Sequence, residues 1–337
     1  MIPSSARNQP ESPSFILASR GSTLALWQAN FVADKVRSLG HGVEIKTWKT
    51  TGDIVQDRFL HEIGGKGLFI KELEEAMAQG AAHFAVHSLK DMPAKIPSRF
   101  ALAAVLKRHQ SADVIIFKNN VWPKLGLTPG CMINANLLKT LGPMTVATSS
   151  LRRQSLLAAD CPNIKTVPIR GNVDTRLKKL EAGDWHALIL AEASLERLSI
   201  NDVHAHRLDP CWFIPCAGQG ALAIETLKAS SAFDTVSQLE CPETRRAINI
   251  ERAVLARLGG DCTMPFGCLV ASDSQSPGTL IARAIVLAND GCSASAICSM
   301  NINTPNVEIL LEDALIDELR KNGANNILEK LGINIRI

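Results

Sequence analysis

The chain lacks the features by which several classes of protein are recognised from sequence. It has no tyrosine, only 4% aromatic residues, and no apolar run near the roughly 20 residues of a transmembrane helix. Its nine cysteines include no CxxC pair, which argues against a disulfide framework and against a zinc or other metal site. The formal net charge of +3 is too small to indicate nucleic-acid binding by itself. We therefore expect a reducing, cytoplasmic compartment in which most thiols are small buried apolar groups.

Length and composition indicate a globular protein with more than one domain. Apolar residues make up 46% of the chain and charged residues 20%, which suffices for ordinary hydrophobic cores. A chain of 337 residues is long for a single core, so two or three domains are expected. Residues 1–14 are polar and rich in proline and serine, without the apolar stretch of a signal peptide, and are predicted to be a disordered tail.

Apolar periodicity predicts strands that alternate with helices over the first two thirds of the chain. Short apolar runs typical of strands occupy residues 15–18, 43–47, 84–86, 101–106, 114–117, 145–147 and 187–190, and helices are predicted at 23–39, 68–77, 151–159 and 173–180. In the first helix, Leu24, Trp27, Phe31 and Lys35 recur at helical spacing. The alternation is typical of doubly wound α/β units with mostly parallel sheets.

The last quarter of the chain has a different pattern. An apolar helical stripe covers residues 247–258 and is followed by predicted strands at 280–287 and 297–302. A helical stretch over residues 308–331, broken near Gly323, closes the chain. We expect a smaller α+β domain here.

Arginines and hydroxyl side chains recur where predicted strands end. Arg20 and Ser22 follow the first strand, residues 148–153 (Thr-Ser-Ser-Leu-Arg-Arg) follow a later one, and Arg170 and Arg176 flank another turn. In open α/β sheets these turns lead into helix N-termini, which offer free N–H groups to anions. A single turn is equally well explained by a capped helix with a solvated arginine. The recurrence favours a shared anion site, because a guanidinium group can form two parallel hydrogen bonds to a carboxylate or phosphate.

A second polar cluster ends a predicted buried strand. Residues 85–93 read Ala-Val-His-Ser-Leu-Lys-Asp-Met-Pro, so His87, Ser88, Lys90 and Asp91 crowd the end of that strand. A surface ion pair is the usual fate of neighbours such as Lys90 and Asp91. The buried character of the strand and the strand-end position favour an active site, whereas His87 alone is better explained as a packed, hydrogen-bonded side chain.

Two glycine-rich segments carry a reactive side chain. Residues 64–67 read Gly-Gly-Lys-Gly without the spacing of a P-loop, so a mobile flap is a better interpretation than a nucleotide cradle. Residues 258–267 place Cys262 on a loop between a helix and a strand, which is a poor position for a core residue. Cys262 is therefore a candidate nucleophile or covalent attachment point, although most cysteines are structural.

In their order and spacing these segments resemble the porphobilinogen deaminase (hydroxymethylbilane synthase) family. The motifs that carry the resemblance lie at residues 17–22, 24–29, 49–53, 65–74, 85–93, 148–154, 170–177, 218–220, 223–225 and 251–252 and in the Cys262 loop. They cover nearly the whole chain after Ser14. Each motif is modestly specific, whereas the ordered set leaves little room for another family.

The resemblance implies three domains and a covalent cofactor. The first two domains resemble the lobes of type II periplasmic binding proteins, and the third presents Cys262. The implied bounds are residues 15–108 with 220–240 for domain 1, 109–219 for domain 2 and 241–337 for domain 3. In the family, dipyrromethane is attached to the cysteine by a thioether bond. Four porphobilinogen molecules are joined to it in turn with loss of ammonia, and linear hydroxymethylbilane is released by hydrolysis.

The resemblance also implies roles for single residues. Porphobilinogen carries an acetate and a propionate, and loss of ammonia leaves an electron-poor azafulvene whose positive charge a carboxylate stabilises. Asp91 takes that role and can assist proton transfer. The residues implied to bind the cofactor are Cys262 (covalently), Ser88, Lys90, Asp91, Thr148, Ser149, Ser150, Arg152, Arg153 and Arg170. Those implied to bind substrate are Arg20, Ser22, Gln28, Phe69, Arg176, Arg197 and Gln219, and the flexible loop contains Gly65, Lys66 and Gly67.

Two departures from the family pattern bear on function. After Arg108 the family commonly continues x-Asp-Pro-Arg-Asp-Ala, whereas this chain reads His-Gln-Ser-Ala-Asp-Val over residues 109–114. An arginine expected to contact carboxylates is thus Ala112, and we expect altered elongation or product release. The cofactor loop reads Gly-Asp-Cys where Gly-Gly-Cys is common, so Asp261 is interpreted as tolerated and Cys268 as a weaker alternative thiol.

Two rival functions are weighed against this one. A non-catalytic two-lobed binding protein for a small polycarboxylate would share the fold, but the Cys262 loop and the expected lack of a signal peptide argue against it. A nucleic-acid binder is disfavoured because few aromatic residues stand beside the arginine-rich turns for base stacking. We expect a monomer that takes porphobilinogen as a small-molecule substrate, with no nucleic-acid or membrane partner.

Overall fold

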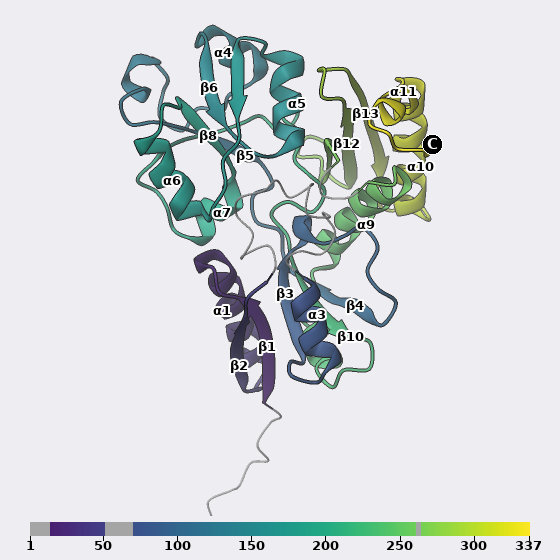
Figure 1. Cartoon of the computed structure of the whole chain (residues 1–337). Helices are drawn as coiled ribbons and strands as arrows, with labels where there is room; N and C mark the ends of the chain where they lie inside the picture. The colour runs from purple at the N-terminus through teal and green to yellow at the C-terminus, as the bar shows by residue number, and fades with distance from the viewer. Residues whose placement is uncertain (1–13, 51–69, 261–263) are drawn as a thin grey trace, which may run out of the picture.

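The computed structural model describes residues 14–50, 70–260 and 264–337, which form three bodies (Figure 1). Two are α/β lobes built on five-stranded sheets, and the third is a three-stranded antiparallel sheet with helices. In Figure 1 the first lobe lies below, the second at the upper left and the third at the upper right. In the described part of the chain, every helix is too short or too polar to cross a membrane. The predicted class, two α/β lobes plus an α+β domain, is confirmed.

The first lobe is assembled from two separate stretches of chain. Its elements are β1 (Phe15–Arg20), α1 (Thr23–Ser38), β2 (Val43–Trp48), α3 (Lys71–Ala78), β3 (Phe84–Ser88), the 3-10 turn η1 (Leu89–Asp91), β4 (Phe100–Val105), β10 (Leu222–Leu227) and α8 (Phe233–Ser237). The strand order is β2-β1-β3-β10-β4, in which β10 alone is antiparallel to its neighbours. The parallel strands β1 and β3 end at the same edge of the sheet, so the turns that follow Arg20 and Ser88 lie together there.

The second lobe repeats this arrangement. Its elements are β5 (Asp113–Phe117), the 3-10 turn η2 (Trp122–Lys124), α4 (Ala135–Thr140), β6 (Met144–Ala147), α5 (Leu151–Asp160), β7 (Ile164–Val167), α6 (Val173–Ala182), β8 (Ala187–Ala191), α7 (Glu192–Arg197) and β9 (His204–Arg207). The strand order is β7-β6-β8-β5-β9, with β5 antiparallel to β8 and β9. In each sheet four strands point one way and the fifth runs against them, which agrees with the prediction of mostly parallel sheets.

Two crossover segments join the lobes and contact each other. The amide of His109, on the way out, donates to the carbonyl of Gly220 on the way back, at 3.0 Å. Gly220 has φ +85°, and a Cβ there would lie 2.7 Å from the His109 carbonyl oxygen and 2.8 Å from that of Gln110. Only glycine meets both conditions, because its lack of a Cβ permits positive φ and the close approach of a second backbone.

The third domain packs its helices on one face of its sheet and its other face on the second lobe. It contains α9 (Pro242–Arg257), β11 (Phe266–Ser272), β12 (Thr279–Leu287), β13 (Ser293–Asn301), α10 (Val307–Lys321) and α11 (Ala324–Lys330). The break predicted near Gly323 is confirmed: this glycine has φ +91° and separates α10 from α11. Leu269, Ile285 and Leu287 belong to the same buried cluster as Phe213 of the second crossover. The third domain therefore shares apolar core with the second lobe.

Candidate functional site

A pocket opens where β1 and β3 of the first lobe end. Its volume is about 70 Å³, and its lining residues come from β1, α1, α3 and the end of β3. They are Arg20, Ser22, Leu24, Ala25, Gln28, Ile70, Leu73, Val86, His87, Ser88 and Asp91. Five of the predicted site residues (Arg20, Ser22, Gln28, Ser88 and Asp91) thus line one pocket.

Local hydrogen bonds explain how the first lobe builds this pocket. Ser22 is the N-cap of α1, and its hydroxyl accepts from the Ala25 amide at 3.3 Å. One turn later, the buried Gln28 donates from Nε2 to the Ser88 hydroxyl at 2.8 Å. The first turns of α1 are therefore fixed to the end of β3, and Asp91 follows directly in η1.

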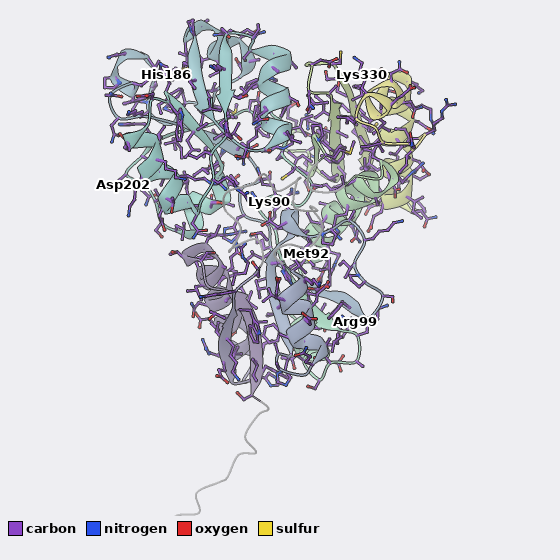
Figure 2. All side chains as sticks on the ribbon, viewed as in Figure 1. Lys90, Met92, Arg99, His186, Asp202 and Lys330 are labelled. Atoms are coloured by element: carbon purple, nitrogen blue, oxygen red, sulfur yellow. The ribbon has the colours of Figure 1, made fainter. Side chains whose placement is uncertain are left out.

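Lys90 connects the pocket to the crossovers. Figure 2 shows it near the centre of the molecule, where the three bodies meet. Its Nζ donates to Gln219 Oε1 at 3.3 Å, and Gln219 in turn donates from Nε2 to Asp113 Oδ1 at 2.9 Å. Burial lowers the pKa of Lys90, although Cys216, Asp91 and Asp113 act in the opposite direction. The predicted residues Lys90 and Gln219 are in direct contact, and Asp113 is an anchor that sequence reasoning missed.

Arg152 and Arg153 are paired within the protein. Both lie in the first turn of α5, and their NH2 groups each donate to one oxygen of Asp113 at 2.7 Å. Their NH1 groups donate to the carbonyls of Ile214 and Ile189 at 2.8 Å. Burial raises the pKa of Asp113, but the two guanidinium groups outweigh it and hold that pKa well below its ordinary value. The buried Nε atoms of both arginines have no hydrogen-bond partner among the described residues.

Arg170, Arg176 and Arg197 bring further positive charge from the second lobe. Arg176 Nε donates to the Gly171 carbonyl at 2.7 Å, and Arg197 NH2 donates to the Gly220 carbonyl at 2.8 Å. The pKa of Arg176 is lowered to about 10 by burial and by the Arg153 and Arg170 charges, with Asp91 acting in the opposite sense. Burial also lowers the pKa of Arg197 to about 10, opposed by Glu196 and Asp91. Asp91 of the first lobe is thus within electrostatic reach of two arginines of the second.

The hydroxyl groups after β6 hold the neighbouring turns in place. Ser149 Oγ donates to the Ile169 carbonyl at 2.7 Å and accepts from the Ile169 amide at 2.9 Å. Thr148 Oγ1 accepts from the amide of Ser150, the N-cap of α5, at 3.3 Å. The turn after β6 is therefore tied to the segment that leads to Arg170, which aligns two of the predicted arginine-rich turns.

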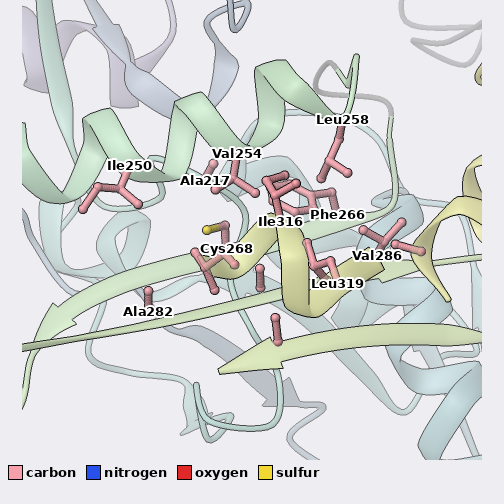
Figure 3. Close-up of a cluster of buried hydrophobic side chains, with 14 of the residues drawn as sticks. Ala217, Ile250, Val254, Leu258, Phe266, Cys268, Ala282, Val286, Ile316 and Leu319 are labelled. Carbon is pink, nitrogen blue, oxygen red and sulfur yellow. The ribbon is translucent and has the colours of Figure 1, made fainter. Parts of the chain in front are cut away.

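Several predicted residues fall outside the described part of the chain. They are Gly65, Lys66, Gly67, Phe69, Asp261 and Cys262. The weaker alternative thiol, Cys268, is described: it is fully buried in the core of the third domain beside Val254 and Phe266 (Figure 3). Burial raises its pKa well above that of a free thiol. Such a thiol is poorly placed for covalent attachment, so the structure disfavours Cys268.

The charges of the site fit a ligand with several carboxylates. Burial and the positive charges of Arg153 and Arg170 together lower the pKa of Arg176 to about 10. Within the described residues, one buried nitrogen of Arg170 (NH1) and one of Arg197 (Nε) have no hydrogen-bond partner. Buried cations without partners are costly, and carboxylates supply both charge and acceptors. The residues therefore fit dipyrromethane and its acidic side chains.

The family model and the curated relatives agree with this chemistry. A family model described as porphobilinogen deaminase, dipyromethane cofactor binding domain, matches residues 15–235. The chain is 39% identical over 329 residues to a porphobilinogen deaminase of Burkholderia vietnamiensis, covering 96% of this chain and 94% of that protein. It is 41% identical over 280 residues to one of Chromobacterium violaceum, covering 82% and 85%. Among solved structures, substrate-binding domain 2 of Lactococcus lactis GlnP matches with a TM-score of 0.41 and 12% identity, covering 74% of this chain and 93% of that one.

Proposed function

The chain belongs to the porphobilinogen deaminase family of tetrapyrrole-forming transferases, and we propose that Asp91 is the catalytic carboxylate of its reaction with porphobilinogen. One observation carries the proposal: Asp91, beside Lys90 on the first lobe, acts electrostatically on Arg176 and Arg197 of the second. A substrate between the lobes would meet the carboxylate and the guanidinium groups together.

In the proposed reaction, the arginines position the substrate and Asp91 stabilises the charge that develops on it. Arg20, Arg170 and Arg176 hold the acetate and propionate groups of porphobilinogen, which orients the pyrrole ring toward Asp91. As the C–N bond breaks, its electron pair leaves with ammonia and positive charge develops on the pyrrole nitrogen. Asp91 stabilises that charge and accepts the N–H hydrogen bond. The dipyrromethane group, bound through Cys262, supplies the pyrrole end to which each substrate unit is joined.

Replacing Asp91 tests its assigned role. We expect Asp91→Ala to fold normally, because the residue is exposed at the end of η1, and to lose turnover by a factor of about 10² or more. Thermal unfolding checks the fold, and hydroxymethylbilane formation measures turnover. Asp202→Ala, at an exposed position in the second lobe, is the matched control and should keep full activity. Near-normal turnover of Asp91→Ala would refute the role.

The intact mass of the purified protein tests the covalent cofactor. We expect the wild-type mass to exceed that of the sequence by two pyrrole units, because dipyrromethane stays attached by a thioether bond. Cys262→Ala should remove the excess and the activity, whereas Cys211→Ala, at an exposed free thiol, should keep both. An active preparation with the bare sequence mass would rule out the covalent cofactor.

A cytoplasmic monomer is the proposed state of the protein. The eight cysteines in the described ranges are all free thiols, which supports a reducing compartment. Sedimentation of the loaded protein measures its oligomeric state, and a stable dimer would contradict this part of the proposal.

A further inference from the structure

Three titratable side chains meet behind the pocket, and the proposed chemistry uses none of them. On the antiparallel pair β3–β10, His87 lies opposite Ala223 and Glu225 lies opposite Ala85, so His87 and Glu225 are diagonal neighbours on one face. His87 Nε2 is 2.9 Å from Glu225 Oε2, with side chains 5% and 0% exposed. Helix α3 packs against both strands, and its Glu74 is close enough to Glu225 for the charge of Glu225 to raise the pKa of Glu74.

Two carboxyl groups in contact share a proton, because a low-dielectric site disfavours two adjacent negative charges. Burial is the largest cause that raises the pKa of Glu74, to about 7, and the Glu225 charge adds to it. His87 on β3 and Arg99 before β4 act to lower the pKa of Glu74, and Arg252 on α9 faces Glu225. They do not suffice to keep both carboxyl groups ionised below neutral pH.

This cluster borders the substrate pocket directly. His87 and Leu73, the residue before Glu74, both line the pocket that contains Asp91. We propose that Glu74, Glu225 and His87 are positioning residues whose shared proton sets the charge behind the pocket and thereby tunes the binding of anionic porphobilinogen. This inference rests on the proposed function, since it assumes that the substrate of Asp91 enters this pocket.

The sign of the effect follows from the charges. Below about pH 7 Glu74 carries its proton and adds no charge beside His87. Above that pH Glu74 is ionised and adds a negative charge. This charge repels the acetate and propionate of the substrate, so the KM for porphobilinogen rises while kcat changes less, because the cluster does not touch the reacting atoms. Substrate binding reciprocally favours the protonated pair.

The variant Glu74→Gln tests this in the cofactor-loaded enzyme. It keeps the shape of the side chain and can donate a hydrogen bond to Glu225, but it removes the titration. We expect the wild-type KM to rise several-fold between pH 6 and 8, the KM of Glu74→Gln to stay flat, and Glu75→Gln, an exposed neighbour on α3, to behave as wild type. A Glu74→Gln profile that superimposes on the wild type would overturn the inference.

A measurement without turnover separates this inference from the role of Asp91. In protein labelled with ¹³C at glutamate carboxyl groups, we expect one resonance to titrate near pH 7, present in wild type and Glu75→Gln and absent from Glu74→Gln. If the wild-type protein shows no such resonance, proton sharing is refuted independently of the role of Asp91. This measurement on the wild type does not depend on the folding of any variant. If the resonance is present but Asp91→Ala keeps near-normal turnover, the proposed function fails, and with it the positioning role.

Discussion

At the scale of single residues, Asp113 shows why arginine positions alone do not identify free ligand-binding groups. Arg152 and Arg153 were predicted as anion ligands because two basic residues begin a helix after a strand. The structure places the carboxylate of Asp113 between them, fully buried, with Gln219 as a third donor. These contacts fix the orientation of both guanidinium groups. Support of this kind from neighbouring residues holds binding groups in a defined geometry.

Replacing Asp113 by asparagine should therefore destabilise the protein strongly. The substitution leaves two buried guanidinium groups without a counter-charge, and losing one partner of a buried ion pair costs about 3–5 kcal/mol. Asp317→Asn, at an exposed i,i+3 pair with Arg320, is the control and should have almost no effect. Denaturant unfolding near pH 7 measures both, and equal stabilities of the two variants would contradict the structural role.

The same pair predicts a pH dependence of stability. Because the pKa of Asp113 is lower in the folded than in the unfolded protein, its contribution is complete above the unfolded value of 3.8. It is lost progressively as pH falls below that value toward the folded pKa. Asp113→Asn should lack this part of the acid-induced loss, so the stability difference between wild type and variant should shrink as pH falls below about 4.

At the scale of helices and strands, the sequence predicts much of the fold because the spacing of apolar residues identifies most of the strands and helices. The predicted strands and helices from residue 15 to 190 correspond to β1 to β6, to β8, and to α1, α3, α5 and α6. The sequence does not single out β7, β9, β10 and β11, because short runs such as His204–Arg207 lack a distinctive pattern. The insertion of β10 between β3 and β4 is a long-range pairing that local periodicity does not encode.

Helix α1 shows that helical spacing alone does not tell what an apolar face contacts. Trp27 and Phe31 recur at helical spacing but are only half-buried, whereas Gln28, Val32 and Val36 face the core. The two aromatic rings stack 5.1 Å apart, and the edge of the His109 ring approaches Trp27 at 5.9 Å. The aromatic face therefore contacts the crossover to the second lobe. Sequence periodicity detects both apolar faces of a helix without telling which partner each one has.

At the scale of the whole molecule, one buried carboxylate joins the crossovers to the third domain. Glu251 on α9 accepts from Arg108 NH1 at 2.6 Å and NH2 at 3.2 Å. It also accepts from the amides of Gly218 at 2.7 Å and Val270 at 2.9 Å, and it is fully buried. Arg108 lies at the first crossover, Gly218 at the second and Val270 in β11. A single side chain thus fixes both lobe connections to the domain that carries Cys262.

We expect Glu251→Ala to weaken the coupling between these bodies as well as the total stability. The substitution leaves the Arg108 guanidinium and two amides without their acceptor, at a cost of about 3–5 kcal/mol. Since the lost contacts lie between domains, we expect calorimetry to show one transition for the wild type and two transitions, at lower temperature, for Glu251→Ala. Glu308→Ala, which removes an exposed partner of Arg246, is the control and should keep one transition. If Glu251→Ala also unfolds in a single, unshifted transition, the apolar contacts of β11 and β12 with the second lobe hold the third domain in place without this carboxylate.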